Sequence, residues 1–256
     1  MQPADKRGRL CRMRRRLIEL AQLHGAIHIA SALSCLEIVD DLLQRRMRYR
    51  PAEPLWADRD RLILSKGHGA LALYLELCEL GVIRWSDLKR NYHRGKLRGC
   101  LTLDPNHGIE ASTGSLGQGL SLALGIAMAF KRQGRRSRIF VVMGDGECQE
   151  GMFWEALHFW DKMRFRNIRL VIDNNGLQGM GELVNTSLDR VRQYAHALPI
   201  RIVRTRKGQG IPFMEGNNYY HYCKLSEQEL CAAFDAVRKE EEKAKSEERR
   251  AKSKGQ

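Results

Sequence analysis

The chain has 256 residues and a formal net charge of +14, and its length suits one large domain or two small ones with a proper hydrophobic core. No apolar run reaches the roughly 18 to 20 residues that span a bilayer, and the basic N-terminus lacks the apolar core of a secretory signal. Residues 1–16 carry seven basic side chains and one acidic one, and residues 238–256 carry eight basic and five acidic ones, so about +9 of the charge lies at the two ends. These basic segments lack the interleaved aromatic residues that are typical of nucleic-acid-binding proteins.

Apolar residues at helical spacing predict a series of amphipathic helices along the chain. The first is expected over about 9–24, and the second over about 34–46, where Ser34 would be the N-cap and Glu37 follows three residues later. Later segments with the same spacing predict helices over 70–80, 119–133 and 152–164, and a helix or loop over 188–197. In the longest of these, residues 121–130 have almost no polar face, so we expect that helix to be buried all round.

Four short, mainly apolar runs alternate with the helices. They lie at 60–64, 138–144, 168–174 and 200–205. Strands that are apolar on both faces and are separated by helices indicate an α/β fold, with a parallel sheet covered by helices on both faces. We expect one domain over residues 1–230. The remainder, 231–256, alternates in charge and predicts a charged tail, either helical or disordered.

Two of the predicted strands end in polar residues. Asp145 lies between Gly144 and Gly146 at the end of one strand, and Asn175 ends the next strand after a spacer of 27 residues, 147–173. A spacer of this length holds one crossover helix, and ligands of open α/β sheets bind beyond the carboxyl ends of the strands. A carboxylate and an amide oxygen suit Mg²⁺ or Ca²⁺, and the glycines let a bulky anion approach the backbone. The pattern therefore predicts a metal-bridged diphosphate.

The stretch "GDGECQEG", followed by 27 residues and "NN", resembles the thiamine diphosphate-binding motif of thiamine-dependent enzymes. Four further stretches resemble those of the transketolase family and occur in its order. They are "HIASALSCLEIVDDL", "DRLILSKGHGALALY", "GIEASTGSLGQGLSLALGIAMA" and "KGQGIPFMEGNNYYHY". The resemblance runs from about residue 10 to 230. More narrowly, the chain is similar to the N-terminal, diphosphate-binding subunit of split transketolases.

By this resemblance, the side chains of Asp145 and Asn175 and the backbone carbonyl of Leu177 match the family's Mg²⁺ ligands, with Ca²⁺ or Mn²⁺ as alternatives. A larger set matches positions that contact the cofactor: His68, Gly114, Ser115, Leu116, Gly144, Gly146, Glu147, Asn175 and His221.

The same resemblance implies four catalytic positions. His68 matches a histidine that contacts the diphosphate, and His28 and His221 match histidines near the substrate and the reactive carbon. Imidazoles titrate near neutral pH, which suits acid–base steps. Glu150 matches a glutamate that links the two active sites across the dimer interface.

The sequence departs from the family pattern in three places. The first histidine of the family is followed by glycines that are absent from "IHIAS", so His24 is a rival to His28. The loop that normally carries an active-site His-Pro is short, and His107 is a loose candidate for it. Roughly forty residues are missing near residue 197, which removes one strand and one helix and leaves a neighbouring strand in need of cover.

The resemblance implies a transferase that moves a two-carbon ketol, or an acyl, unit from a ketose to an aldehyde and acts on a sugar or sugar phosphate. The glutamate that activates the aminopyrimidine lies on a second domain in this family, so we expect a separate C-terminal subunit in an α2β2 heterotetramer, without nucleic acid or membrane partners. Seven scattered cysteines lacking a C-x-x-C pair indicate reduced thiols in the cytoplasm. A degenerate scaffold that keeps the fold and a 2-oxoacid dehydrogenase-like subunit remain alternatives.

Overall fold

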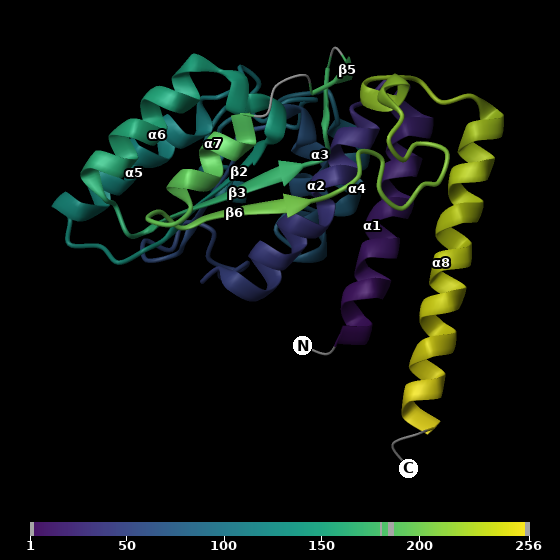
Figure 1. Cartoon of the computed structure of the whole chain (residues 1–256). Helices are drawn as coiled ribbons and strands as arrows, with labels where there is room; N and C mark the ends of the chain where they lie inside the picture. The colour runs from purple at the N-terminus through teal and green to yellow at the C-terminus, as the bar shows by residue number, and fades with distance from the viewer. Residues whose placement is uncertain (1–2, 180, 184–186, 254–256) are drawn as a thin grey trace.

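The structure, a computed structural model, describes residues 3–179, 181–183 and 187–253. A four-stranded parallel sheet lies at its centre, in the strand order β1-β2-β3-β6 (Figure 1). The strands are β1 (Arg61–Leu64), β2 (Ile139–Gly144), β3 (Ile168–Asn174) and β6 (Ile200–Arg204). The predicted α/β fold with a parallel sheet is confirmed, and each of the four apolar runs forms a strand.

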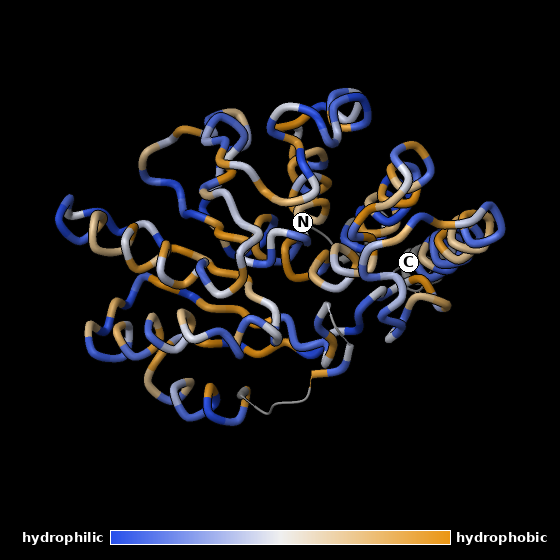
Figure 2. Tube along the Cα trace, turned by 90° about the horizontal axis from the view of Figure 1, so that it is seen from above, coloured by the Kyte–Doolittle hydropathy of each residue, from blue (hydrophilic) through white to orange (hydrophobic). Residues whose placement is uncertain are grey.

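Helices cover both faces of the sheet (Figure 1). The helices are α1 (Pro3–His24), α2 (Ile29–Asp41), α3 (Ala70–Glu79), α4 (Trp85–Asn91), α5 (Gly119–Arg132), α6 (Gly151–Met163), α7 (Ser187–Tyr194) and α8 (Glu227–Ser253). One turn of π-helix, Leu42–Arg46, extends α2, and a two-stranded hairpin, β4 (Leu177–Gln178) and β5 (Gly181–Glu182), follows β3. Seen from above, hydrophobic residues gather along the central strands (Figure 2).

Successive side chains of each strand point to opposite faces, so the sheet separates two hydrophobic cores. On β2, Phe140 and Val142 belong to the core under α1, α2 and α3, whereas Val141 and Met143 belong to the core under α5, α6 and α7. The presence of a core on each side of the sheet explains why the strands carry apolar residues on both faces.

The N-terminal and C-terminal helices lie side by side, with both chain ends at the same end of the molecule (Figure 1). Buried Arg14 of α1 bonds to Glu240 of α8 at 3.0 Å and to Glu37 of α2 at 2.8 Å. Arg15 pairs with Glu241 in the same seam. Much of the basic charge of the N-terminus is therefore paired within the chain. Because α8 continues through residue 230, a domain division there stays a prediction.

Two predictions about helices are wrong. Helix α2 begins at Ile29, so Ser34 lies in the middle of the helix, where its buried hydroxyl donates to a buried carboxylate instead of capping a helix end. Helix α5 is buried on one side only, because it packs on the sheet and α6 and none of the described residues covers its other side. Leu122 and Met128 are each 38 % exposed there.

The shortened region lies where the sequence indicated. Helix α7 ends at Tyr194, five residues separate it from β6, and residues 187–199 contain no strand. Asn185 and Thr186, which belong to the same region, lie outside the described residues. In the described parts of the chain β6 pairs with β3 alone, so it is an edge strand. No helix among the described residues is both long and apolar enough to cross a membrane.

Candidate functional site

A cleft of about 250 Å³ opens at the carboxyl ends of the strands. Parallel strands deliver their carboxyl ends to one edge, and residues distant in sequence meet there. The cleft is lined by His28, Ser31, Lys66, His68, Cys100, Gly114, Leu116, Gly144, Asp145, Gly146, Glu147, Asn175, Leu177, Gln178, Gly179, Lys207 and His221.

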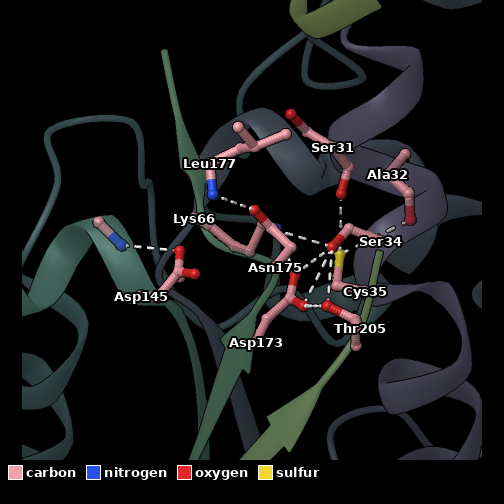
Figure 3. Close-up of polar contacts among 12 residues, drawn as sticks. Ser31, Ala32, Ser34, Cys35, Lys66, Asp145, Asp173, Asn175, Leu177 and Thr205 are labelled. Atoms are coloured by element: carbon pink, nitrogen blue, oxygen red, sulfur yellow. Dashed lines mark hydrogen bonds and ion pairs between the residues drawn. The ribbon is translucent and has the colours of Figure 1, made fainter. Parts of the chain in front are cut away.

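The floor of the cleft is organised around the buried carboxylate of Asp173, near the end of β3 (Figure 3). Lys66, which follows β1, lies 2.6 Å from Asp173 Oδ2 and is itself 2 % exposed. The hydroxyls of Ser34 on α2 and Thr205 after β6 also donate to this carboxylate. Three strand ends and one helix therefore converge on a single buried carboxylate, and an ion pair and hydrogen bonds compensate its burial.

Two neighbouring strand ends carry the predicted metal ligands (Figure 3). Asp145, 2 % exposed, accepts hydrogen bonds from the backbone N–H groups of Gly146 at 2.9 Å and Gly176 at 2.6 Å. Asn175 donates to Ser34 Oγ at 3.0 Å, and its side-chain oxygen accepts from the N–H of Leu177 at 2.9 Å. Burial raises the pKa of Asp145, so a cation beside it would stabilise its ionised form.

Three imidazoles meet at the mouth of the cleft. The ring centroids of His28, His68 and His221 lie 5.3 to 5.8 Å apart. Burial lowers the pKa of His68 to about 2 and that of His221 to about 4, and it also lowers the pKa of His28, so all three rings are neutral at pH 7. His28 Nδ1 is buried and has no hydrogen-bond partner among the described residues, which leaves one ring nitrogen free for a ligand.

Two lysines that line the cleft were missed by sequence reasoning, although both lie in quoted motifs. Burial alone would lower the pKa of Lys66, but Asp173 raises it above the ordinary value. Lys207, 2 % exposed, donates to the carbonyl of Gln178 and to Asn218 Oδ1, and forms no ion pair with a described carboxylate. Burial lowers the pKa of Lys207 to about 8. An anionic ligand beside Lys207 would stabilise its charged form.

Glycine is required at the wall of the cleft. A Cβ on Gly67 would lie 2.4 Å from the carbonyl oxygen of Thr113, so the turn carrying His68 can touch the loop carrying Gly114 only without a side chain there. Glu147 fastens the same wall. Its Oε1 accepts from Ser65 Oγ and from the N–H of Gly117 at 2.9 Å, and its Oε2 accepts from the N–H of Gly144. Glu147 thus holds three loops together from beneath the cleft.

Other predicted residues lie outside the lining. Ser115 and Glu150 are exposed, and Glu150 lies on the outer rim beside Gly117. His24 bonds to the carbonyl of Lys89, and His107 bonds to Asp104. Neither His24 nor His107 reaches the cleft, whereas Cys100, a residue that the sequence did not single out, lines it next to Gly114.

The donor set fits a metal-bridged diphosphate better than a bare metal. No group of three or more His, Cys, Asp or Glu side chains that could hold a metal ion occurs in the described residues. Asp145 supplies one carboxylate and Asn175 one amide, so a cation here needs ligands from elsewhere, such as phosphate oxygens. The ammonium of Lys207 and the free nitrogen of His28 supply positive charge and a ring nitrogen on the same cleft.

Comparison with known proteins identifies relatives over nearly the whole chain. Residues 12–216 match the family model described as transketolase, thiamine diphosphate binding domain. A putative uncharacterized transketolase family protein, y4mO of Sinorhizobium fredii, is 30% identical over 260 residues, covering 88% of this chain and 92% of that protein. The 6-deoxy-6-sulfo-D-fructose transketolase subunit SqwG of Clostridium sp. is 31% identical, covering 88% and 92%. One of the subunits of the apulose-4-phosphate transketolase of Phocaeicola vulgatus is 32% identical, covering 82% and 85%.

Solved structures share the fold. Transketolase from Leishmania mexicana superposes with a TM-score of 0.77 at 20% identity and covers 99% of this chain, and the Campylobacter jejuni enzyme gives 0.74 at 22% and 96%. The chain spans less than half the length of these two proteins, 46% and 48%. The alignment with y4mO has 260 positions and includes 88% of the 256 residues of this chain, which is about 225 residues. About 35 aligned positions are therefore gaps in this chain. The size of this shortening is close to the predicted deletion of roughly forty residues.

Asp173→Asn should lower the free energy of unfolding by about 3 to 5 kcal/mol, because the buried ammonium of Lys66 loses its counter-charge. Urea denaturation measures this directly. Asp161→Asn is the matched control, since its pair with Arg164 is partly exposed and should contribute less than about 1 kcal/mol. Equal losses for the two variants would contradict the role assigned to Asp173.

Proposed function

The chain belongs to the transketolase family, and from that premise we propose that it is the cofactor-holding subunit of a two-component transketolase. It would transfer a two-carbon ketol unit from a ketose donor to an aldehyde acceptor with thiamine diphosphate and Mg²⁺. The observation that carries this proposal is the cleft at the strand ends, where Asp145 and Asn175 lie beside the buried cation Lys207. The names of two relatives, each a transketolase subunit of comparable length, support it.

We assign the metal to Asp145, Asn175 and the carbonyl of Leu177. Gly176 N–H and Leu177 N–H already hold the two side chains at neighbouring strand ends, so the ligands are oriented before a metal arrives. Ca²⁺ and Mn²⁺ also accept oxygen ligands of this kind, so either can substitute for Mg²⁺.

We assign the diphosphate to the opposite wall and floor of the cleft. The residues that would contact it are Lys207, His68, Gly114, Leu116, Gly144 and Gly146. Because Gly114 and Gly146 have no side chains, an anion has room to approach the backbone there. Neutral His68 can donate a hydrogen bond to the anion without adding charge. Glu147 would act indirectly, since both of its oxygens already bind protein groups.

When bound, thiamine diphosphate supplies a nucleophilic carbon that cleaves the bond beside a ketone and carries the two-carbon unit to an aldehyde. His28 and His221 stand at the mouth of the cleft, where a sugar would enter. Because their pKa values are lowered by burial, each ring is neutral and can accept a proton from a substrate hydroxyl at pH 7. Ser31 Oγ, 3.4 Å from His221 Nδ1, would orient that ring.

A partner chain should complete the active site. Helices α5 and α6 leave an apolar stripe exposed, with Leu122 and Met128 on α5 and Met152, Phe159 and Met163 on α6, each 38 to 43 % exposed. A stripe of this kind marks a protein interface. Glu150 lies at its rim, in place to reach a second site. We propose a C-terminal subunit that carries the pyrimidine-binding domain and its activating glutamate, assembled as α2β2.

Asp145→Ala should weaken binding of thiamine diphosphate in the presence of Mg²⁺ by about a hundredfold or more, because the carboxylate ligand is lost. Calorimetric titration measures the affinity. Thermal unfolding gives an independent value, since saturation at 100 times the Kd adds about 2.7 kcal/mol to the parent. Glu155→Ala, an exposed carboxylate of α6, should bind like the parent. Unchanged affinity of Asp145→Ala would refute the metal site, and a parent that does not bind would favour the scaffold alternative.

Cofactor affinity should depend on pH through Lys207. The free protein loses the Lys207 proton above pH 8, and the bound diphosphate favours the charged form, so affinity should be flat below pH 8 and fall by up to about tenfold per pH unit above it. The measurement is the Kd between pH 7 and 9.5. Lys207→Gln should bind more weakly with no slope above pH 8, and a slope that survives in this variant would assign the titration to another group.

The chain without its partner should show no ketol transfer when it is supplied with thiamine diphosphate, Mg²⁺ and several ketose donors. Addition of the partner subunit should restore turnover to the parent but not to Asp145→Ala, which controls for activity of the partner alone. Turnover by a pure preparation of this chain would show that the activating acid lies within its own 256 residues.

A further inference from the structure

A second pocket, of about 570 Å³, lies at the amino edge of the sheet, opposite the cleft. It is formed where the segment before β1 meets the segment before β2. Arg48 Nη2 donates to the carbonyl of Arg136 at 3.3 Å, and Arg138 Nη2 donates to the carbonyl of Arg46 at 2.6 Å. The residues that line the pocket are Arg48, Trp56, Asp58, Gln133, Gly134, Arg135, Arg136 and Ser137.

Hydrogen-bond donors dominate this lining. Three arginines, Arg48, Arg135 and Arg136, line the pocket together with one acidic residue, Asp58. Ser137 is 1 % exposed, and its hydroxyl has no hydrogen-bond partner in the parts of the chain that the structure describes. The hydroxyl of Ser137 is therefore available to bond to a ligand held by the neighbouring arginines.

A neighbouring carboxylate neutralises only part of the pocket. Buried Asp60 accepts hydrogen bonds from Arg138 and from the backbone N–H and side chain of Arg48, so it compensates these two arginines and leaves Arg135 and Arg136. Arg135 donates to the carbonyl of Ala57 at 3.4 Å and lies 5.7 Å from the ring centroid of Phe130. Within the described residues, neither Arg135 nor Arg136 forms an ion pair.

The surrounding surface strengthens the positive potential. Residues 45–61, 131–138 and 162–169, which precede three parallel strands, carry 15 basic and 3 acidic side chains. Ion pairs compensate part of this excess: Arg59 and Arg61 pair with Glu110, Arg48 and Arg138 with Asp60, Arg46 with Asp41, Arg50 with Glu53, and Arg164 with Asp161. The arginines of α1 are paired with acids of α2, α3 and α8. Several basic side chains of the amino edge, among them Arg135 and Arg136, remain without an ion pair in the described residues and add positive potential there.

We propose that the pocket formed by Arg48, Arg135, Arg136 and Ser137 binds a multiply charged phosphate group, of the size of a di- or triphosphate. Arginine forks match phosphate oxygens in pairs, and the Ser137 hydroxyl and the Gln133 amide add neutral donors. One face of Trp56 is already covered by Arg50, whose guanidinium carbon lies 4.0 Å from the ring centroid. The pocket thus recognises the phosphate charge, which a free polyphosphate and a nucleotide share. It is separate from the cofactor cleft and does not depend on the function proposed for that cleft.

The test is calorimetric titration of the full chain with inorganic tripolyphosphate at fixed ionic strength. Arg135→Gln and Arg136→Gln should each weaken one saturable binding event by about tenfold, and Asp58→Asn should strengthen it. Two controls separate this site from other causes. Arg192→Gln removes an exposed arginine of α7, and Lys207→Gln impairs the cleft, and both should leave this event unchanged. Because the side chain of Arg136 makes no hydrogen bond or ion pair with the described residues, its variant should melt like the parent.

Adenosine triphosphate, titrated in parallel, distinguishes the two phosphate sources. Affinity equal to that of tripolyphosphate would show that the phosphate alone is recognised, and higher affinity would show that the nucleoside adds contacts. The proposal fails if Arg136→Gln binds tripolyphosphate as the parent does, or if Arg192→Gln weakens binding equally, since that would reveal a general charge effect. It also fails if Lys207→Gln abolishes the event, which would place it in the cleft.

Discussion

The ion pair between Asp173 and Lys66 is the constraint on which the site depends. Both groups are almost completely removed from water, and neither would remain charged there alone. Their pairing brings the end of β1 to the end of β3, and the hydroxyls of Ser34 and Thr205 add α2 and β6 to the same point. The pair adds little net stability, because desolvation opposes the attraction. The role of the ion pair is to hold the ends of β1 and β3 in place, because removing either partner would leave the other as a buried charge without a counter-charge.

Charge is arranged in opposite ways at the two edges of the sheet. At the carboxyl edge, Lys66 is paired with Asp173, whereas Asp145 and Glu147 are held by uncharged hydrogen-bond donors and Lys207 by uncharged acceptors. At the amino edge, arginines crowd around Asp60, and the excess is positive. A cleft with one uncompensated cation and one metal-type carboxylate suits a metal-bound diphosphate, whereas the amino edge suits an anion without a metal. The two ends of the chain still carry most of its net charge, although the arginines of α1 are largely paired with acids of α2, α3 and α8.

The sequence was sufficient for the sheet, since strands apolar on both faces leave few alternatives to a covered parallel sheet. It also placed Asp145 and Asn175 at neighbouring strand ends, because parallel strands put those ends at one edge. It failed at Ser34, because the local pattern predicted a helix N-cap, whereas the Ser34 hydroxyl bonds to Asp173, 139 residues away in the sequence. It also failed at α5, because an all-apolar helix has the same sequence pattern whether it is buried entirely within its own chain or partly against another chain. Lys66 and Lys207 were overlooked because a lysine after a strand usually faces solvent. His24 and His28 were separable only in three dimensions, where Tyr92 and Lys89 hold His24 away from the cleft.

The shortened sheet raises a separate physical problem, because β6 is an open edge that could pair with another chain. The residues of β6 and the turn after it address this problem. Arg201 and Arg204 are exposed on the strand, and Arg206 follows it. Arg201 lies 3.9 Å from Asp41 and Arg206 pairs with Glu215, so of these three only Arg204 forms no ion pair among the described residues. In a second copy of this chain paired edge to edge, the uncompensated charge of Arg204 would oppose pairing of the two strands. The apolar stripe on α5 and α6 exposes five large hydrophobic side chains, so a partner is expected on that stripe rather than on the edge of β6.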